Sequence, residues 1–169
     1  MDVYQAIESR HSVRSFQDRP VDDAVLGRLL TAAQGAPSGR NLQEWKLVVL
    51  REAELRAQLA AVCDQSFMAG APVVLALVAT NPDRMMFCGV SAAPVDGAIV
   101  LDHLSLAAAS EGLGTCWIGH FDQDATRKLL AVPPSCRIIE LMLLGYPDRP
   151  APARRRKAID HLICYERYQ

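Results

Sequence analysis

The stretch DGAIVLDHLSLAAASE, residues 96–111, constrains the fold more than any other part of the sequence. It carries apolar side chains on nearly every side of a helix, and the polar positions between its charged ends are Asp102, His103, Ser105 and Ser110. A helix that is apolar nearly all round has to be buried nearly all round. A chain of 169 residues, the size of one average domain, offers few such places. The stretch therefore predicts a helix in the middle of a subunit interface.

The composition is that of a folded protein without a strongly charged partner. Half of the residues are hydrophobic and 22% are charged, which allows a real core and argues against disorder. The net charge is −1, from 18 basic and 19 acidic side chains, so we expect no nucleic acid as partner. The opening residues MDVYQAIESR lack an apolar signal core, and no segment reaches about 18 apolar residues without a charge, so we expect no membrane partner.

Cysteine and histidine usage points to a cytoplasmic protein without a metal site. The cysteine count is odd and no pair has C-x-x-C spacing, so we expect reduced, buried and inert thiols, which are typical of the cytoplasm. No histidine pairs with a cysteine at ligand spacing. The residues concerned are Cys63, Cys88, Cys116, Cys136 and Cys164, with His11, His103, His120 and His161.

Hydrophobic periodicity predicts an α+β fold built in layers. Besides the apolar helix, spacing predicts helices over residues 2–9, from Asp22 or Asp23 to about Gly35, around Leu55, Leu59 and Val62, and after Asp122 or Asp124. Apolar runs predict strands over 45–50, 71–79, 114–119 and 137–146. The strands and helices follow no regular βαβ rhythm, which favours α+β layers over a doubly wound sheet.

The short run RHSVRSF, residues 10–16, concentrates anion-binding groups. Arg10 and Arg14 are fixed cations with several N–H donors each, and Ser12 adds a hydroxyl. A solvated basic turn explains the run equally well when it is taken alone. A second cationic run, ARRRKAI at 153–159, has the same two readings: a solvated tail, or a group that converges with the first run on one phosphate.

Two further stretches carry groups suited to a planar ligand. In APSGRNLQEW a turn of Pro37, Ser38 and Gly39 delivers the carboxamides of Asn41 and Gln43 just before a predicted strand. Carboxamides offer both donors and acceptors, as the edge of a heterocycle requires, although solvated amides in a capped loop would look the same.

In EGLGTCWIGHF, residues 111–121, glycines surround Trp117 and let a backbone approach a ligand closely. Their spacing, G-x-G-x-x-x-x-G, does not match the dinucleotide fingerprint G-x-G-x-x-G, and a long helix precedes it, so a Rossmann site is rejected. A strand flanked by turn glycines is the alternative reading.

In this order, four motifs resemble those of the FMN-dependent nitroreductase family, also described as flavin oxidoreductases. RHSVRSF corresponds to a family pattern R-R-S-x-R-x-F and APSGRNLQEW to A-P-S-x-x-N-x-Q-P-W; DGAIVLDHLSLAAASEGLGTCWIG corresponds to the central helix and following strand, and GYPD with RRRK to the C-terminal part. The resemblance covers almost the whole chain. It implies one FMN-binding domain over residues 1–169, with a three-layer α-β-α fold, a central mixed but mostly antiparallel sheet, and an interlocked homodimer.

The resemblance also implies which residues bind the cofactor. Those around the phosphate and ribityl chain of FMN would be Arg10, His11, Ser12, Arg14, Arg154 and Arg156. Those reaching the other side of the flavin from the partner subunit would be Pro37, Ser38, Gly39, Asn41 and Gln43. The backbone of Trp117, Ile118 and Gly119 would lie along the isoalloxazine ring with an amide near N5, and Gln65 is a further candidate.

The chain also departs from the family pattern. His11 stands where the family has a second arginine, which removes a permanent charge and makes phosphate affinity sensitive to pH. Glu44 stands in place of the proline before Trp45, and Ala158 in place of a common proline after the basic run. Residues 80–95 form a short link where many relatives carry a longer helical insertion over the active site.

The expected function is therefore that of an FMN-dependent oxidoreductase. NADH or NADPH would reduce the flavin, leave, and be replaced by a small-molecule electron acceptor such as a nitroaromatic or a quinone, in a ping-pong reaction. The cofactor carries the chemistry, so we expect no catalytic acid, base or nucleophile from the chain. The alternatives are a non-catalytic flavin-binding or storage protein, and a specialised family member such as a reductive dehalogenase or a flavin-consuming enzyme.

Overall fold

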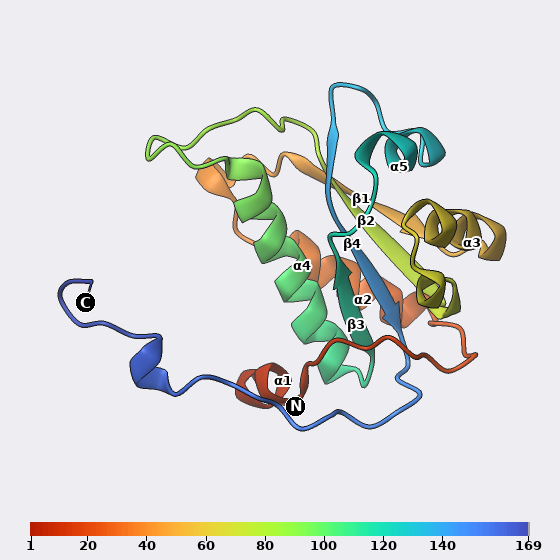
Figure 1. The fold of residues 1–169 in the computed structure, drawn as a ribbon, viewed down its shortest axis with the longest axis horizontal. Helices are drawn as coiled ribbons and strands as arrows, with labels where there is room; N and C mark the ends of the chain where they lie inside the picture. Colours follow the sequence, from red (N-terminus) through yellow and green to blue (C-terminus); the bar gives the residue numbers. More distant parts are fainter. Residues whose placement is uncertain (169) are drawn as a thin grey trace.

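The computed structural model describes residues 1–168 and contains one four-stranded antiparallel sheet between two layers of helices (Figure 1). The strands lie in the order β1-β2-β4-β3. Their bounds are β1 Trp45–Leu50, β2 Val73–Ala79, β3 Gly114–Ile118 and β4 Arg137–Gly145. The helices are α1 Val3–Ser9, α2 Asp23–Gln34, α3 Ala53–Val62, α4 Ala92–Ser110 and α5 Gln123–Leu129, with short 3₁₀ turns η1 Gly39–Asn41, η2 Ser66–Gly70 and η3 Ile159–His161.

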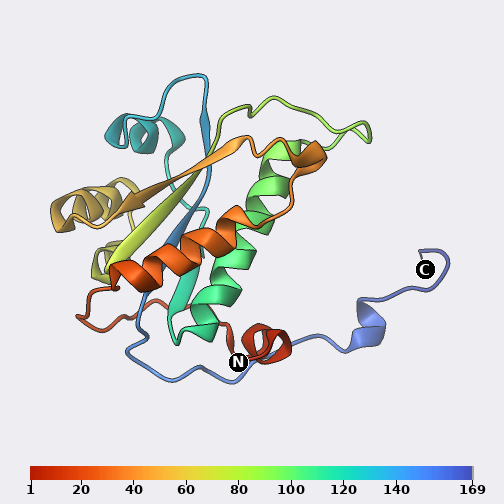
Figure 2. The same ribbon diagram turned by 180° about the vertical axis from the view of Figure 1, so that it is seen from behind.

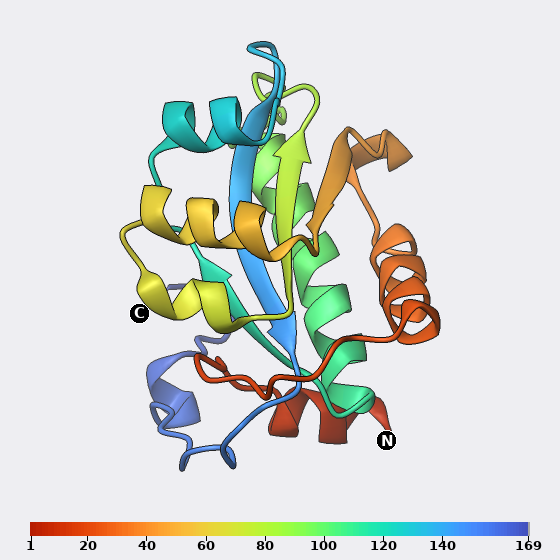
Figure 3. The same cartoon turned by 90° about the vertical axis from the view of Figure 1, so that its right-hand side faces the viewer.

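The predicted α+β fold in three layers is confirmed. Helices α2 and α4 cover one face of the sheet, and α3, η2 and α5 cover the other (Figure 3). The fully buried strand β2 divides its side chains between the two cores, since Leu75 and Leu77 pack toward α4 while Val74 and Ala76 pack toward α3. All strand pairs are antiparallel, and the parallel contact among residues 1–168 is a single bridge between Ser12 and Thr115.

Local signals in the sequence set several helix ends. Asp2 begins α1 with a capping box, in which its carboxylate accepts from the Gln5 N–H (2.9 Å) and the Gln5 side chain accepts from the Asp2 N–H (3.0 Å). Of the two predicted starts of α5, the structure uses Asp122, whose side chain accepts from the Ala125 N–H. In α2, which begins at the predicted Asp23, the core side chains are Leu26, Leu29 and Ala33.

Helix α4 is the central helix and begins four residues before its predicted start. One side is buried against α2 and the sheet (Figure 2), where Gly97 allows an approach so close that a Cβ would lie 2.4 Å from the Leu77 Cδ2. The other side carries Val95, which is exposed, and the half-buried Ile99 and Leu106. By length and hydropathy alone α4 would also suit a membrane span, but such a test is equally passed by core helices.

Two facing glycines let the N-terminal segment cross the end of the sheet. Gly114 on β3 pairs with Gly145 on β4. A Cβ on Gly114 would lie 2.3 Å from the Val13 Cγ2, and a Cβ on Gly145 would lie 2.5 Å from the Pro72 Cδ and 2.9 Å from the Phe16 Cδ1. The missing side chains therefore create the space in which residues 12–16 are seated.

The C-terminal residues after β4 leave the body of the chain. They run past α1 and then extend away from the layers (Figures 1 and 2). Their large apolar side chains are exposed: Ile159, Leu162, Ile163, Tyr165 and Tyr168. Within residues 1–168, these apolar side chains are therefore not buried against the rest of the chain.

We predict that Gly145→Ala lowers the free energy of unfolding by about 1–3 kcal/mol, because the added methyl meets the rigid Pro72 ring. Urea denaturation provides the measurement. Gly27→Ala is the matched control: no atom lies within 4 Å of its added Cβ, and alanine in the middle of α2 should stabilise by up to about 1 kcal/mol. Equal effects of the two substitutions would contradict close packing at Gly145.

Candidate functional site

Residues 12–14 present two polar side chains on either side of a buried one. The Val13 N–H donates to the Thr115 carbonyl (2.9 Å), which fixes the segment against the start of β3. Successive side chains of an extended chain point to opposite sides. Val13 is buried, and Ser12 and Arg14 are accordingly exposed. The fold of the sheet end thus turns the serine and the arginine toward solvent together.

These polar groups surround a hollow and lack acceptors from the described part of the chain. Ser12, Arg14, His11 and Arg149 line a hollow of about 400 Å³, here called the Arg14 hollow. Within residues 1–168, neither the guanidinium of Arg14 nor that of Arg10 forms a side-chain hydrogen bond or an ion pair. Unpaired guanidinium donors beside a hydroxyl are suited to an anion with several acceptor oxygens, such as a phosphate.

The two tail arginines have different surroundings. Arg154 donates to the carbonyls of Ile7 (2.8 Å) and Glu8 (2.5 Å), which are among the last carbonyls of α1 and lack partners within the helix. Arg10 caps the same helix, so Arg154 lies at the same end of α1 as the first cationic run. Arg156 is exposed and donates to the carbonyl of its neighbour Arg155 (3.2 Å).

Strand β3 leads from the Arg14 hollow to a second cavity along an open sheet edge. The bridge between Ser12 and Thr115 covers only the start of this edge. Because backbone groups of alternate residues face the same edge, Trp117 presents its N–H and C=O groups there, and among residues 1–168 the only group that bonds this carbonyl is the Cys116 thiol (3.7 Å). From Thr115 to Gly119 the strand spans about 13 Å, at roughly 3.3 Å per residue. An elongated ligand can therefore lie along β3.

The second cavity, here called the Gly119 cavity, lies beyond the end of β3 and has a volume of about 520 Å³. Its lining comes from β4, the first turn of α4 and the loops after β2 and β3: Pro82, Ser91, Ala93, Pro94, Gly119, Phe121, Gln123, Arg137, Ile138, Ile139 and Glu140. Gln65 lies beside it, since its side-chain amide donates to the His120 carbonyl (3.2 Å). The size is that of a site for a small molecule.

Glu140 brings a carboxyl group to this cavity. A Cβ built on Gly119 would lie 3.4 Å from its Oε1 and 3.6 Å from its Oε2. Burial raises the pKa of the Glu140 carboxyl above its ordinary value. No hydrogen bond or ion pair to this carboxyl is formed within residues 1–168. The cavity therefore contains an acid that is more easily protonated than an ordinary glutamate.

The carboxamides of the second motif lie in a strained turn before β1. Arg40, Asn41 and Gln43 all have positive φ angles (57°, 56° and 52°), which are uncommon for residues with a Cβ. The Ser38 hydroxyl accepts from the Gln43 N–H (3.0 Å), and the Gln43 side chain donates to the Asn41 carbonyl (3.0 Å). These contacts hold an exposed turn in one conformation, although Pro37, Asn41 and Gln43 are not part of the core.

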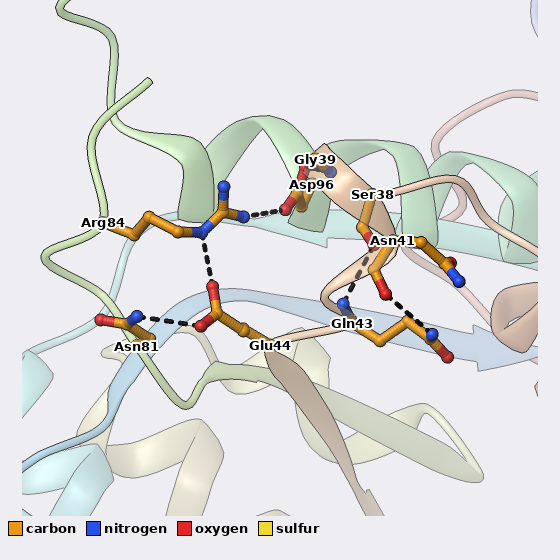
Figure 4. A network of polar contacts seen from close by, with 8 residues as sticks. All are labelled: Ser38, Gly39, Asn41, Gln43, Glu44, Asn81, Arg84 and Asp96. Atoms are coloured by element: carbon orange, nitrogen blue, oxygen red, sulfur yellow. Dashed lines mark hydrogen bonds and ion pairs between the residues drawn. The ribbon is translucent and has the colours of Figure 1, made fainter. Parts of the chain in front are cut away.

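A half-buried arginine fixes this turn to α4 (Figure 4). Arg84 pairs with Glu44 (2.5 Å) and with Asp96 in the first turns of α4 (2.6 Å). Asp96 also accepts from the Gly39 N–H (3.0 Å). A hydrogen bond from Asn81, together with Arg84, holds the pKa of Glu44 below its ordinary value. The link between β2 and α4 is therefore anchored through Asn81 and Arg84.

Within one chain, the turn and the Arg14 hollow lie apart. Residues 37–43 precede β1, whereas the Arg14 hollow and the Gly119 cavity lie along β3, and these strands form opposite edges of the sheet. Three strand spacings of about 4.8 Å separate the edges by roughly 14 Å. The structure thus brings together Arg10, His11, Ser12, Arg14 and Arg154 at one end of β3, and Gln65, Ile118 and Gly119 at the other, but leaves the turn elsewhere.

Sequence reasoning missed Arg84, Asp96 and Glu140. Asp96 was visible as a charge at the start of an apolar helix, but its partner lies in a loop without a motif. Glu140 was visible as the one charge inside the apolar run RIIELMLLG. The expectation of buried thiols is correct for Cys63 and Cys116 and wrong for Cys88 and Cys164, which are exposed because they lie in loops. Burial raises the pKa of Cys63 to about 11.

Comparison with known proteins gives a consistent result for sequence and structure. The profile of the Nitroreductase family matches residues 7–66 and 59–146 of this chain. A protein named NADH dehydrogenase from Thermus thermophilus is 28% identical over 197 residues, which cover 98% of this chain and 96% of that protein.

Two solved structures illustrate the similarity of the fold. Nitroreductase A from Vibrio parahaemolyticus superposes with a TM-score of 0.90 at 28% identity, covering 100% of this chain and 77% of the other. The NADPH:FMN oxidoreductase from Vibrio harveyi, solved in complex with NAD+, superposes with a TM-score of 0.89 at 25% identity, covering 99% of this chain and 78% of the other. Both are thus similar along nearly all of the present chain and longer than it.

The Arg84 network leads to a prediction about the turn. Asp96→Ala should lower the free energy of unfolding by about 3 kcal/mol, because it leaves Arg84 and the Gly39 N–H without their buried acceptor. It should also speed tryptic cleavage after Arg40. The control is Asp102→Ala, an exposed residue of the same helix, for which we expect a change within about 0.5 kcal/mol. Unchanged cleavage at Arg40 in the Asp96 variant would show that the turn does not depend on this contact.

Proposed function

Because this chain belongs to the nitroreductase family, we propose that it is an FMN-dependent oxidoreductase that uses NADH or NADPH to reduce small electron-poor acceptors. The observation that carries the proposal is the pair of hollows joined by the open edge of β3, with unpaired cationic donors at one end and a small-molecule cavity at the other. An elongated cofactor with one terminal phosphate and a flat ring system suits this arrangement. The names of two related proteins, NADH dehydrogenase and NADPH:FMN oxidoreductase, support the same function.

The residues present fit FMN. Arg10, Ser12 and Arg14 supply donors that no acceptor of residues 1–168 satisfies, and they would hold the phosphate with His11 and Arg149 alongside. The edge-facing backbone of Trp117 and the side-chain-free Gly119 would lie along the ring system. A single terminal phosphate requires no dinucleotide fingerprint, which agrees with its absence from the sequence.

Bound FMN would supply the redox chemistry, namely acceptance of a hydride from the nicotinamide and transfer of two electrons to the acceptor. The chain orients both substrates in turn at one face, and this sharing predicts ping-pong kinetics. Quinones and nitroaromatics suit the Gly119 cavity, since apolar side chains such as Phe121 and Pro94 line it beside the polar groups. The exposed Met85 and Phe87 in the anchored link add a soft apolar wall near the same end of α4.

We further propose a homodimer in which each subunit completes the site of the other. The turn of Ser38, Asn41 and Gln43 lies at the sheet edge opposite to β3, so one chain cannot place it and the Arg14 hollow on the same ring system. A second copy can. The exposed apolar tail and the outer side of α4 would supply the interface, and residues 1–169 would form one FMN-binding domain of a cytoplasmic enzyme.

The proposal predicts that the purified protein is yellow and releases FMN, not FAD, on denaturation. Arg14→Ala should weaken FMN binding about ten- to a hundredfold, the value of one lost charge-assisted phosphate contact, without changing the urea midpoint of the flavin-free protein. Fluorescence titration with FMN provides the measurement. Arg155→Ala is the control, since this exposed arginine lies outside both hollows.

Recovery of stoichiometric FAD, or failure of the reconstituted protein to bind any flavin, would refute the proposal. NADH- or NADPH-dependent bleaching of the yellow colour, followed by recovery on adding a quinone, distinguishes an enzyme from a flavin-storage protein. The quaternary prediction is checked separately: sedimentation should give a dimer at micromolar concentration, and a stable flavin-loaded monomer would contradict the shared site.

A further inference from the structure

The carboxyl group of Glu140 lines a cavity beside a glycine, an arrangement that packing of the core does not require. It comes from β4, near the buried Ile138 and Leu141, is itself half-buried, and lines the Gly119 cavity. Its Oε1 is within 3.4 Å of the position that a Gly119 side chain would occupy. Any residue larger than glycine at 119 would therefore contact this carboxyl, and the absence of that side chain leaves the acid open to the cavity.

The other charged and titratable groups near the carboxyl are few. Arg137 lines the same cavity from β4, His120 follows Gly119, and the thiol of Cys116 on β3 interacts electrostatically with Glu140. From the remaining elements around the cavity come uncharged side chains: Ala93 and Pro94 of α4, and Gln123 of α5. Nearby Asp96 is already paired with Arg84. Within residues 1–168 no cation forms an ion pair with Glu140, so burial alone determines the direction of its pKa shift and favours the protonated form.

We propose that Glu140 is the proton donor of this site, giving its carboxyl proton to the electron acceptor in the Gly119 cavity. This inference rests on the proposed function and adds a role for one of the chain's own residues. Reduction of a quinone to a hydroquinone consumes one hydride and one proton, and the nicotinamide supplies only the hydride. The Glu140 O–H bond breaks, an O–H bond forms on the quinone oxygen, and water entering the cavity then returns a proton to the carboxylate.

The two half-reactions differ in the number of protons that they consume. Transfer of a hydride from the nicotinamide consumes no proton, so that half-reaction does not need Glu140. Transfer to a quinone does, and its rate should be high while Glu140 is protonated and should fall as the pH rises through the raised pKa of this carboxyl. An acceptor that takes single electrons without protons, such as ferricyanide, should be indifferent to Glu140.

The test uses Glu140→Gln, which preserves size and polarity but cannot donate a carboxylic proton. In stopped-flow measurements we expect the quinone-consuming half-reaction to slow about ten- to a hundredfold below the raised pKa and to lose its fall with pH. The nicotinamide-consuming half-reaction and ferricyanide reduction should change by less than about twofold. Glu52→Gln, at an exposed carboxylate, and His120→Gln serve as controls that should retain the wild-type pH profile.

A second readout does not depend on catalysis. In the flavin-free protein, the ¹³C carboxyl resonance that disappears in Glu140→Gln should titrate above the ordinary range of a glutamate. The variant should also be more stable than the wild type at pH 8, where the wild type buries a charge, and equally stable at pH values below about 4.3, where glutamate is protonated in both states.

The proposal would be overturned if Glu140→Gln kept the full quinone rate and the wild-type pH profile. It would also be overturned if His120→Gln, and not Glu140→Gln, lost the fall of this rate with pH. An ordinary titration of the Glu140 resonance would do the same. Failure of the protein to bind flavin would instead refute the proposed function, and the carboxyl titration would still report on Glu140.

Discussion

The burial of α4 between α2 and the sheet is the constraint on which the other features depend. Its close approach at Gly97 fixes the height of the helix above β2. From its first turns Asp96 holds the turn before β1 and the link after β2. At its far end Glu111 accepts two hydrogen bonds from Arg28 (2.6 and 2.8 Å), which joins α4 to α2. One apolar helix therefore positions polar segments that have few contacts with each other.

The open edge of β3 follows from how the N-terminal segment is seated. Gly114 and Gly145 admit Val13 and Phe16 over one end of the sheet, and this segment bridges β3 at Thr115 and the chain after β4 at Pro147. Beyond Thr115, no other strand within residues 1–168 pairs with this edge, although sheets normally cover or protect their edges. An edge that is covered at one end by a cationic run and left open toward a cavity is consistent with the elongated cofactor proposed for it.

Much of the fold could be predicted from the sequence because its signals are local. The strand at Trp45–Leu50 and the buried run of β2 follow from apolar continuity, and α1 follows from its capping residue Asp2. Helix α4 begins at Ala92, before the predicted start at Asp96, and its first turn contains Pro94, a position where proline is tolerated. The cationic runs are suited to a phosphate, but only the structure distinguishes Arg14, whose guanidinium has no partner within residues 1–168, from Arg154, which binds carbonyls of α1. The contacts of Arg84, Asp96 and Glu140 join distant parts of the chain and have no sequence signal.

The electrostatic character of the site changes along β3, and the thiol of Cys116 interacts with the charged groups at both ends of the strand. Burial is the main cause that raises the pKa of its thiol; Arg14 lowers this pKa and Glu140 raises it. Arg14 lies at the end of β3 next to the Arg14 hollow, where its positive charge favours an anion. The acid belongs to the end where no described cation pairs with it, so that its neutral form is favoured. A strand with a fixed positive charge at one end and a protonatable carboxyl at the other suits a ligand whose phosphate is permanently charged and whose far end exchanges electrons with molecules that also need protons.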